Sequence, residues 1–511
     1  MKQNIIIFHT DQQRFDSLGC NGSQYARTTN IDALAAEGCN FTRHISTNPA
    51  CMPSRASLMT GLYVPGHGVS SNGIPLWRRD NGCEDKNNQI SQRLFGVNVK
   101  DRIPTIADML SGKGYDTALF GKIHLEPHLA DPSYDFYESY SAWEQENILD
   151  DKKPYYGFKT KKIILGHGEQ PCGYNRGHYG RWLNENHPEW VKKVTPGEDI
   201  NTKEGSIADD IYVSELPAKL HNTMWLADEV CEFLEGKQAK DSDEPNFIFV
   251  GYPDPHHPFT PPKEIADEFS DIPLPDFTKK SDIQGKKPKA VMQAIENFNA
   301  DPVDLANAYR HTAASIKLID NSIGQIVDKL KELNIYDDTL IIFTSDHGDF
   351  MGDLDMICKY DMAFNNLLHL PFIVKPSANM KALPKTCQTP MSNADVLPTI
   401  FNFIGEEVET HVQGINIFGE NAENNTPMVT CYTAREANRN IAIYDEKYRY
   451  SYYLDTHEEE LYDHDSDPKE LINLADIGDE NHKEICKKLK DLLFKKHIDT
   501  HIGIFNHYGL W

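Results

Sequence analysis

The chain has 511 residues, of which 39% are hydrophobic and 10% aromatic, so it can build a large core and is not intrinsically disordered. Its net charge of −26, from 51 Lys and Arg against 77 Asp and Glu, argues against a nucleic acid or an anionic membrane as partner. An anionic substrate would therefore need a locally positive pocket. The ten cysteines form no CxxC pair, which argues against a disulfide framework.

The N-terminus predicts a first strand rather than a signal peptide, because the short apolar run 5–8 gives way at once to polar residues. No stretch approaches the ~18 apolar residues of a membrane span. We therefore expect a cytoplasmic protein, or a periplasmic or secreted one if a leader has been removed.

Strands and helices alternate from the N-terminus to about residue 378. The expected strands are 5–8, 116–120, 247–250, 339–344 and 371–374, and the expected helices are 29–38, 104–110, 219–234 and 305–333. This alternation is typical of an α/β fold with a large, doubly wound, mostly parallel sheet flanked by helices.

The pattern changes beyond Pro384. A helix at 395–404, short strands around 428–432 and 441–453, and a helix at 482–496 predict a smaller antiparallel sheet with a closing helix. We therefore expect a catalytic domain over 1–378 and a smaller α+β subdomain over 379–511.

Three segments carry little regular pattern. Residues 130–215 form an insertion rich in Tyr, Trp, His and Gly, which we interpret as substrate-pocket lining or an oligomer arm. Residues 270–300 are expected to form an exposed connection. The apolar tail 505–511 suggests a docked segment in a homo-oligomer.

Polar side chains follow several of the predicted strands. They are Asp11 and Gln12, Lys122 and His124, His256, and Asp346 and His347, with Lys359 twelve residues farther on. Open α/β sheets bind ligands at the carboxyl ends of their strands, so these residues are expected to converge. Two carboxylates, an amide oxygen and an imidazole suit one divalent cation.

The stretch from Cys51 to Gly61 adds a thiol at the start of a helix expected over 56–59. The positive end of a helix favours an anion there, and Arg55 offers donors for a tetrahedral oxyanion. Lys122 and Lys359 would add positive charge around the transferred group, and the histidines would move protons.

These motifs together resemble the sulfatase family of the alkaline phosphatase superfamily. Residues 51–61 resemble its C-x-P-S-R-x-x-x-x-T-G signature, 121–125 its G-K-x-H-L element, 256–258 its H-x-P histidine and 344–349 its T-S-D-H-G-D segment. Residues 460–463, 467–468 and 473–475 resemble its closing E-L-Y-D, D-P and N-L-A pattern.

The resemblance implies a mechanism. A maturation enzyme would convert Cys51 to formylglycine, whose hydrate attacks the sulfur of a sulfate ester. The implied metal ligands are Asp11, Gln12, residue 51, Asp346 and His347. Arg55, Lys122 and Lys359 would hold the equatorial oxygens, His256 with Lys359 would protonate the leaving oxygen, and His124 would regenerate the aldehyde. The substrate would be a small anionic ester or a sulfated sugar.

Two departures from the usual pattern leave alternatives open. Gln12 and His347 replace the Asp and Asn of many sulfatases, and Asn72 resembles a substrate-binding asparagine of phosphonate monoester hydrolases. A phosphonate monoester or phosphodiester hydrolase is therefore the second hypothesis, and a binding protein without activity the third. A two-zinc phosphatase ranks lower. Ca²⁺ is the expected metal, with Mn²⁺ or Mg²⁺ as alternatives.

Overall fold

The computed structural model of the chain describes most of its residues. The described ranges are 3–77, 103–134, 136–144, 153–168, 176–194, 210–239, 244–298, 300–409, 411–420, 422–432 and 439–501. The expected docking of the tail 505–511 lies outside these ranges, so the homo-oligomer stays a prediction.

Within the described ranges, nine strands form one large sheet. They are β1 (Asn4–Thr10), β2 (Cys39–Ile45), β3 (Asp116–Gly121), β4 (Thr160–Ile163), β5 (Asn246–Gly251), β6 (Thr339–Ser345), β7 (His369–Lys375), β8 (Thr386–Cys387) and β9 (Met391–Ser392). The order is β4-β3-β5-β1-β6-β7-β2-β8, with β9 also paired to β2. Of these strands β7 alone runs opposite to the rest, which confirms the mostly parallel sheet.

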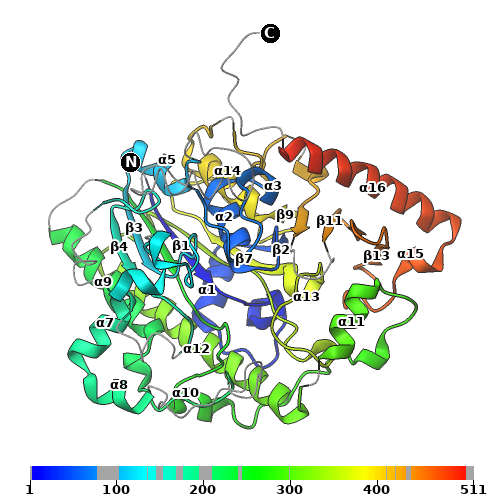
Figure 1. Cartoon of the computed structure of the whole chain (residues 1–511). Helices are drawn as coiled ribbons and strands as arrows, with labels where there is room; N and C mark the ends of the chain where they lie inside the picture. The colour runs from blue at the N-terminus through cyan, green and yellow to red at the C-terminus, as the bar shows by residue number, and fades with distance from the viewer. Residues whose placement is uncertain are drawn as a thin grey trace.

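Helices cover both faces of this sheet (Figure 1). On one face lie α2 (Cys51–Thr60), α3 (Val64–His67), α5 (Ile106–Gly112) and α14 (Asn393–Ile404); on the other lie α1 (Thr29–Glu37), α7 (Gly177–Asn186), α9 (Asn222–Ala239) and α12 (Pro302–Glu332). Side chains alternate along a strand, so Ile5 and Ile7 enter one core while Ile6 and Phe8 enter the other.

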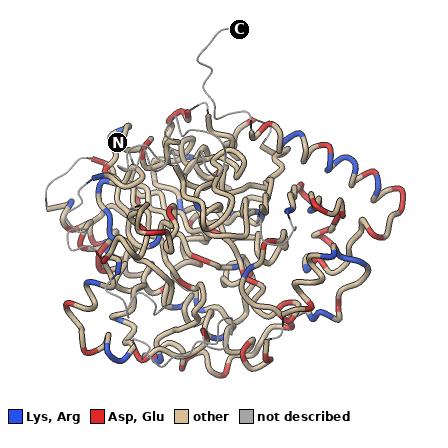
Figure 2. The backbone as a smooth tube through the Cα atoms, in the orientation of Figure 1, with Lys and Arg blue, Asp and Glu red and all other residues tan. Residues whose placement is uncertain are grey.

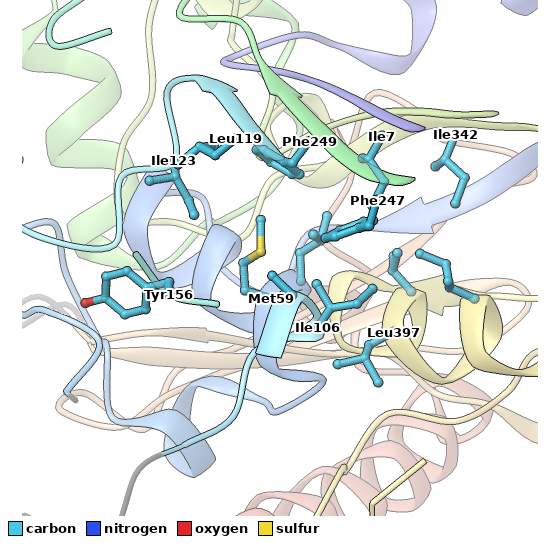
Figure 3. Close-up of a cluster of buried hydrophobic side chains, with 14 of the residues drawn as sticks. Ile7, Met59, Ile106, Leu119, Ile123, Tyr156, Phe247, Phe249, Ile342 and Leu397 are labelled. Carbon is cyan, nitrogen blue, oxygen red and sulfur yellow. The ribbon is translucent and has the colours of Figure 1, made fainter. Parts of the chain in front are cut away.

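The core beneath α2 lies directly under the expected site. Met59, Ile106 and Leu397 bring α2, α5 and α14 together against the sheet (Figure 3). Ile123 is fully buried in the same core, between Lys122 and His124. The loop after β3 is thus anchored by an apolar side chain, which fixes its two polar neighbours above the sheet edge.

The C-terminal part is a four-stranded antiparallel sheet covered by a long helix. Its strands β10 (Met428–Cys431), β11 (Asn440–Tyr444), β12 (Tyr448–Tyr453) and β13 (Glu459–Asp463) lie in sequence order, beside α15 (Leu474–Ile477) and α16 (Glu480–His501). Both expected parts of the fold are therefore present. The boundary at residue 378 stays a prediction. Beyond it, β8 and β9 pair with β2 in the large sheet, and α14 packs on one face of that sheet.

Several segments differ from expectation. The sequence analysis missed β2, in which Thr42 and Arg43 interrupt the apolar pattern at an irregularity of the pairing. The insertion contains β4, α7 and α8 (Pro188–Val194) instead of only loops. The exposed connection expected over 270–300 is wrong in part, because α11 (Lys289–Asn297) buries Val291 and Ile295. Short helices α10 (Lys263–Ala266) and α13 (Asn365–Leu368) complete the fold.

No helix in the described ranges is long and apolar enough to cross a membrane. Charged residues lie mostly in the outer segments of the tube drawing, and both signs alternate along α16 (Figure 2). The charged residues of the expected site are an exception, because they lie buried at the sheet edge.

Candidate active site

The carboxyl ends of the parallel strands bring the predicted residues together. Asp11 and Gln12 follow β1, Lys122 and His124 follow β3, His256 follows β5, and Asp346 and His347 follow β6. Lys359 reaches the same point from the loop beyond His347, because its Nζ lies 3.1 Å from the Sγ atom of Cys51. The convergence that the strand order predicted is thus present.

Cys51 lies at the first residue of α2, which is longer than the helix expected over 56–59. Pro53 fits in the first turn because the first four backbone N–H groups of a helix have no partner within it. Burial and Asp11 would raise the pKa of the Cys51 thiol, but Lys359, Lys122 and His347 outweigh them and lower it. The position therefore stabilises negative charge.

Asn72 lies beside the start of this helix. Its Oδ1 accepts the backbone N–H of Met52 at 3.0 Å, and its Nδ2 lies 3.9 Å from the Sγ atom of Cys51. Asn72 is exposed, unlike the buried Cys51. An exposed amide beside residue 51 is well placed to contact a substrate there.

Arg55 faces the two carboxylates of the site. Its Nε donates to Asp346 Oδ2 at 2.8 Å, and its Nη2 donates to Asp11 Oδ2 at 3.0 Å. Its Nη1 donates to the carbonyl of Lys122 at 2.9 Å, and the side chain is fully buried. The guanidinium therefore orients the carboxylates, whereas the sequence predicted a contact with the oxygens of the substrate.

Lys122 completes the charge balance at Asp11. Its Nζ lies 2.5 Å from Asp11 Oδ2, and it is fully buried. Burial on its own would raise the pKa of Asp11, but Lys122, His256 and Arg55 together hold this pKa well below its usual value. Asp11 thus stays a carboxylate although its side chain is fully buried.

Four side chains offer ligand atoms for one cation. Single atoms of Asp11, Cys51, Asp346 and His347 all lie within 4.8 Å of one another. Gln12, the next residue after Asp11, is the fifth ligand that the sequence predicts: its Nε2 donates to Asp349 Oδ2 at 2.5 Å, while its Oε1 is buried without a hydrogen-bond partner. An orphaned carbonyl oxygen beside two carboxylates fits a divalent cation.

His347 presents the ring nitrogen that a cation needs. Its Nδ1 lies 2.9 Å from the carbonyl of Gly348, so Nδ1 carries the hydrogen and donates it. Its Nε2 lies 3.5 Å from Asp11 Oδ1 and 3.3 Å from Cys51 Sγ. The backbone carbonyl thus selects the tautomer whose unprotonated Nε2 faces Asp11 and Cys51, with Lys359 Nζ 3.0 Å away.

His256 and Lys359 form a proton-sharing pair. The Nδ1 of His256 donates to the carbonyl of His257, so its Nε2 accepts from Lys359 Nζ at 2.8 Å. Burial, followed by the neighbouring His167 and Lys359, lowers the pKa of His256 well below its usual value. Burial would lower the pKa of Lys359, but Cys51 and Asp11 outweigh it and raise this pKa. The proton of the pair therefore resides on Lys359.

His124 is a neutral imidazole. Burial, His128 and Lys122 lower its pKa well below the usual value. Its Nδ1 is buried and has no hydrogen-bond partner. A neutral imidazole with a free nitrogen can accept a proton, which is the chemistry of a general base.

His167 belongs to the site although the sequence analysis assigned it no role. It lies four residues beyond β4, hydrogen-bonds Lys122 through its Nε2, and stacks on His256 with ring centroids 3.7 Å apart. The available signal was Gly166-His167-Gly168 after a strand end, but β4 is short and mostly polar. The insertion thus contributes His167 to the site, while its lining of a substrate pocket stays a prediction.

A second group of possible ligands shares Asp11 with the first. Ligand atoms of Asp11, His167 and His256 also lie within 4.8 Å of one another. The Nζ of Lys122, however, bonds both Asp11 and His167. Lys359 Nζ likewise lies 3.1 Å from Cys51 Sγ and 3.0 Å from His347 Nε2 in the first group. The first group contains two carboxylates and the second only one, so the balance of charge favours a cation at the first group.

Comparisons with known proteins agree with this geometry. The family model described as Sulfatase matches residues 3–406, and the one described as N-sulphoglucosamine sulphohydrolase, C-terminal, matches residues 357–499. An arylsulfatase of Clostridium perfringens is 27% identical, over 97% of this chain and 94% of the relative. A choline-sulfatase of Rhizobium meliloti is 26% identical, over 93% of this chain and 83% of the relative.

A solved structure shows a similar fold. The phosphonate monoester hydrolase of Agrobacterium radiobacter superposes with a TM-score of 0.73 at 23% identity, covering 98% of this chain and 96% of that chain. The similarity covers nearly the whole chain and therefore includes both of its sheets.

Proposed function

The chain belongs to the sulfatase family of sulfuric ester hydrolases, and on this premise we propose that it hydrolyses sulfate esters of small molecules or sugars at Cys51. The observation that carries the proposal is the position of Cys51, where Lys359, Lys122 and a set of cation ligands surround one buried sulfur atom. Such a site favours a tetrahedral anion inside an otherwise acidic protein.

We propose that Cys51 is converted to formylglycine by a maturation enzyme, since a thiol would leave a sulfated cysteine with no easy exit. The hydrated aldehyde supplies the attacking hydroxyl. A divalent cation held by Asp11, Gln12, Asp346 and His347 would supply charge neutralisation and a lowered pKa for that hydroxyl. Ca²⁺ is the proposed ion, with Mn²⁺ or Mg²⁺ as alternatives.

The side chains divide the remaining work. Lys359 gives its proton to the leaving oxygen, and His256 orients Lys359 through the 2.8 Å contact. His124 removes the proton whose loss regenerates the aldehyde and releases sulfate. Lys122, His167 and Asn72 contact the substrate, while Arg55 holds the carboxylates in place. General acid–base groups of this kind each contribute about 10²–10⁴-fold.

Phosphonate monoester or phosphodiester hydrolysis is the second candidate. Gln12, His347 and the exposed Asn72 beside Cys51 favour it, because these residues resemble the pattern of phosphonate monoester hydrolases. Parallel assays with an aryl sulfate and an aryl phosphonate rank the two. A non-catalytic binding protein would turn over neither.

Mass spectrometry of residue 51, in protein made with a maturation enzyme, tests the proposal. Formylglycine would lower the mass of the peptide by about 18 Da, because one oxygen replaces one sulfur and two hydrogens when the CH₂SH group becomes an aldehyde. The Cys51→Ala variant should fold normally and lose turnover. Normal turnover in that variant, or from an unmodified cysteine, would contradict the mechanism.

A further inference from the structure

A buried carboxylate outside the predicted site holds the loop that carries His124. Glu138 has no exposed surface, and its Oε2 accepts the backbone N–H of His124 at 2.7 Å. Its Oε1 accepts the backbone N–H groups of Leu125 at 2.8 Å and Glu126 at 3.2 Å. Three consecutive N–H groups thus depend on one side chain.

The held segment has a backbone conformation that needs support. His124 has a φ of 54°, in the left-handed region that non-glycine residues rarely adopt. Its ring stacks on His128, with centroids 4.1 Å apart, and His128 Nε2 lies 3.6 Å from Glu138 Oε2. Glu138 therefore reaches both the backbone of His124 and the ring beside its imidazole.

Glu138 is in turn fixed by its own neighbours. The hydroxyl of Tyr155 donates to Glu138 Oε1 at 3.0 Å, and the backbone N–H of Glu138 donates to Glu126 Oε2 at 3.3 Å. The contact between residues 126 and 138 is therefore reciprocal. Glu138 and Tyr155 both come from the insertion, so this segment holds the loop after β3 through the Glu138 side chain.

We propose that Glu138 is a positioning residue for catalysis, which sets the place of the His124 imidazole by binding the three backbone N–H groups of residues 124–126. The proposal rests on the proposed role of His124 as the base. A carboxylate suits this task better than an amide, because it offers only acceptors, whereas the NH₂ group of a glutamine would face one of the N–H groups.

A double-mutant cycle in turnover tests the inference on the full-length matured enzyme. We expect Glu138→Gln to lower kcat by about 10-fold to 100-fold with little change in KM, since a well-placed base contributes about 10²–10⁴-fold. In the His124→Ala background the same substitution should change kcat by less than about 2-fold, because the group it positions is already absent.

Glu144→Gln is the matched control. Glu144 lies in the same segment, but its side chain is 70% exposed and its ion pair with Arg176 is long, at 3.6 Å. This variant should keep the kcat of the wild type. A purely structural role for Glu138 would lower kcat in both backgrounds equally, and that result would overturn the inference.

Tyr155→Phe answers the question if Glu138→Gln fails to fold. It removes one of four donors to the carboxylate and keeps the backbone contacts, so kcat should fall a few-fold, and only while His124 is present. Equal losses with and without His124 would again refute the positioning role. Full turnover in His124→Ala alone would instead refute the proposed base, which separates the two failures.

Discussion

Arg55 and Lys122 show how single residues make this site possible. Each buried carboxylate needs a partner, because an unpaired charge in a dry interior is costly. Arg55 binds the Oδ2 atoms of both Asp11 and Asp346, and Lys122 binds Asp11 Oδ2. The Oδ1 atoms of the two carboxylates thus remain turned toward Cys51 and His347. The cations of the chain therefore orient a site for a further cation.

Gln12→Ala should weaken metal binding at this site. The substitution removes the buried Oε1 that lacks a hydrogen-bond partner. Loss of one oxygen ligand should raise the Kd for Ca²⁺ or Mn²⁺ by at least about 10-fold to 100-fold, because substitution of residues that only hydrogen-bond to metal ligands already weakens metal binding by that factor. Calorimetric titration of chelator-treated protein measures this constant.

The neighbouring glutamine supplies the control for that titration. The Nε2 atom of Gln13 donates to Ser17 Oγ at 3.0 Å, and Gln13 is equally buried. Its Oε1 also lacks a hydrogen-bond partner, but Gln13 is not one of the proposed metal ligands. Gln13→Ala should therefore leave the Kd near that of the wild type. Equal effects of the two substitutions would mean that Gln12 holds the loop rather than the ion.

Helix α2 begins at Cys51 and ends at Thr60, and Gly61 caps its C-terminal end. Gly61 has a φ of 68°, and a Cβ atom there would lie 2.8 Å from Val412 Cγ1. Gly61→Ala should therefore lower the free energy of unfolding by about 1–2 kcal/mol, the cost of a left-handed residue with a side chain. Urea denaturation followed by circular dichroism measures the change.

Gly112 offers a helix-end glycine without these constraints. A Cβ atom there meets nothing within 4 Å, and the residue is not among those with a positive φ. Gly112→Ala should be neutral or stabilise by up to about 1 kcal/mol. A similar loss of stability in both variants would point to a general cost of alanine at these ends, and not to the geometry of Gly61.

The C-terminal sheet depends on one buried ion pair. Arg449 is fully buried and binds both oxygens of Glu470, at 2.6 Å and 3.0 Å. Glu470 also accepts the backbone N–H of Asn365, which ties this sheet to α13. Arg449→Leu should therefore cost about 3–5 kcal/mol, because it removes the buried cation that pairs with Glu470 and lies 3.5 Å from the buried Glu460.

An exposed pair in the same sheet gives the comparison. Arg439 binds Asp455 at the surface, with 54% of its side chain exposed. Arg439→Leu should cost no more than about 1 kcal/mol. Differential scanning calorimetry should place the transition of the Arg449→Leu variant well below that of the Arg439→Leu variant. Coincident transitions would contradict the role of the buried pair.

The elements that the sequence predicted well have long apolar patterns. Strands β5 and β6 are buried throughout and β1 is buried beyond its first residue, while α12 carries apolar residues at helical spacing, so their positions were readable. Strands β2 and β4 were not, because polar residues dominate the exposed part of β2 and nearly all of β4. Pairing with neighbours far away in sequence stabilises them, and no local pattern records it.

The same limit applies to the site. Residues that follow strong strands within characteristic motifs, such as Asp11 and Asp346, were predicted and do converge. The partners of the Arg55 side chain could not be predicted from the sequence, because only the folded structure shows that Asp11 and Asp346 lie within reach of its guanidinium. His167 and Glu138 come from an insertion that resembles no known motif. Their roles follow only from what β3 and β4 place beside them.

At the scale of the whole molecule, buried neutral histidines should make stability depend on pH. Burial lowers the pKa of His9, His44 and His67 from 6.5 to about 3 each. In the unfolded chain these groups bind a proton as the pH falls through 6.5, whereas in the folded protein they do so only near 3. The free energy of unfolding should thus fall by about 1.4 kcal/mol per pH unit for each such histidine.

Groups whose pKa is raised in the folded protein, among them His347 and Glu126, oppose this trend over part of the window. Burial and Glu138 raise the pKa of Glu126 from 4.5 to about 7, so the folded protein binds this proton first and gains stability as the pH falls from 7 to 4.5. Glu126 therefore cancels one histidine out of several. Carboxylates with lowered pKa values, such as Glu470 at about 2, lose their contribution only below 4.5.

Between pH 7 and pH 5 the histidines with lowered pKa values and Glu126 titrate together, and these histidines set the direction because there are more of them. Urea midpoints should fall steadily across this range, and His67→Gln should flatten the slope, because an amide can replace the contacts of His67 with Ser57 and Val69 without titrating. Thr500→Ser, at a buried position without a titrating group, should keep the slope of the wild type. An unchanged slope in His67→Gln would show that His67 binds no more protons in the unfolded chain than in the folded one, and would contradict the prediction. A midpoint that stays constant or rises from pH 7 to pH 5 would mean that groups with a raised pKa, such as Glu126, match or outweigh the buried histidines.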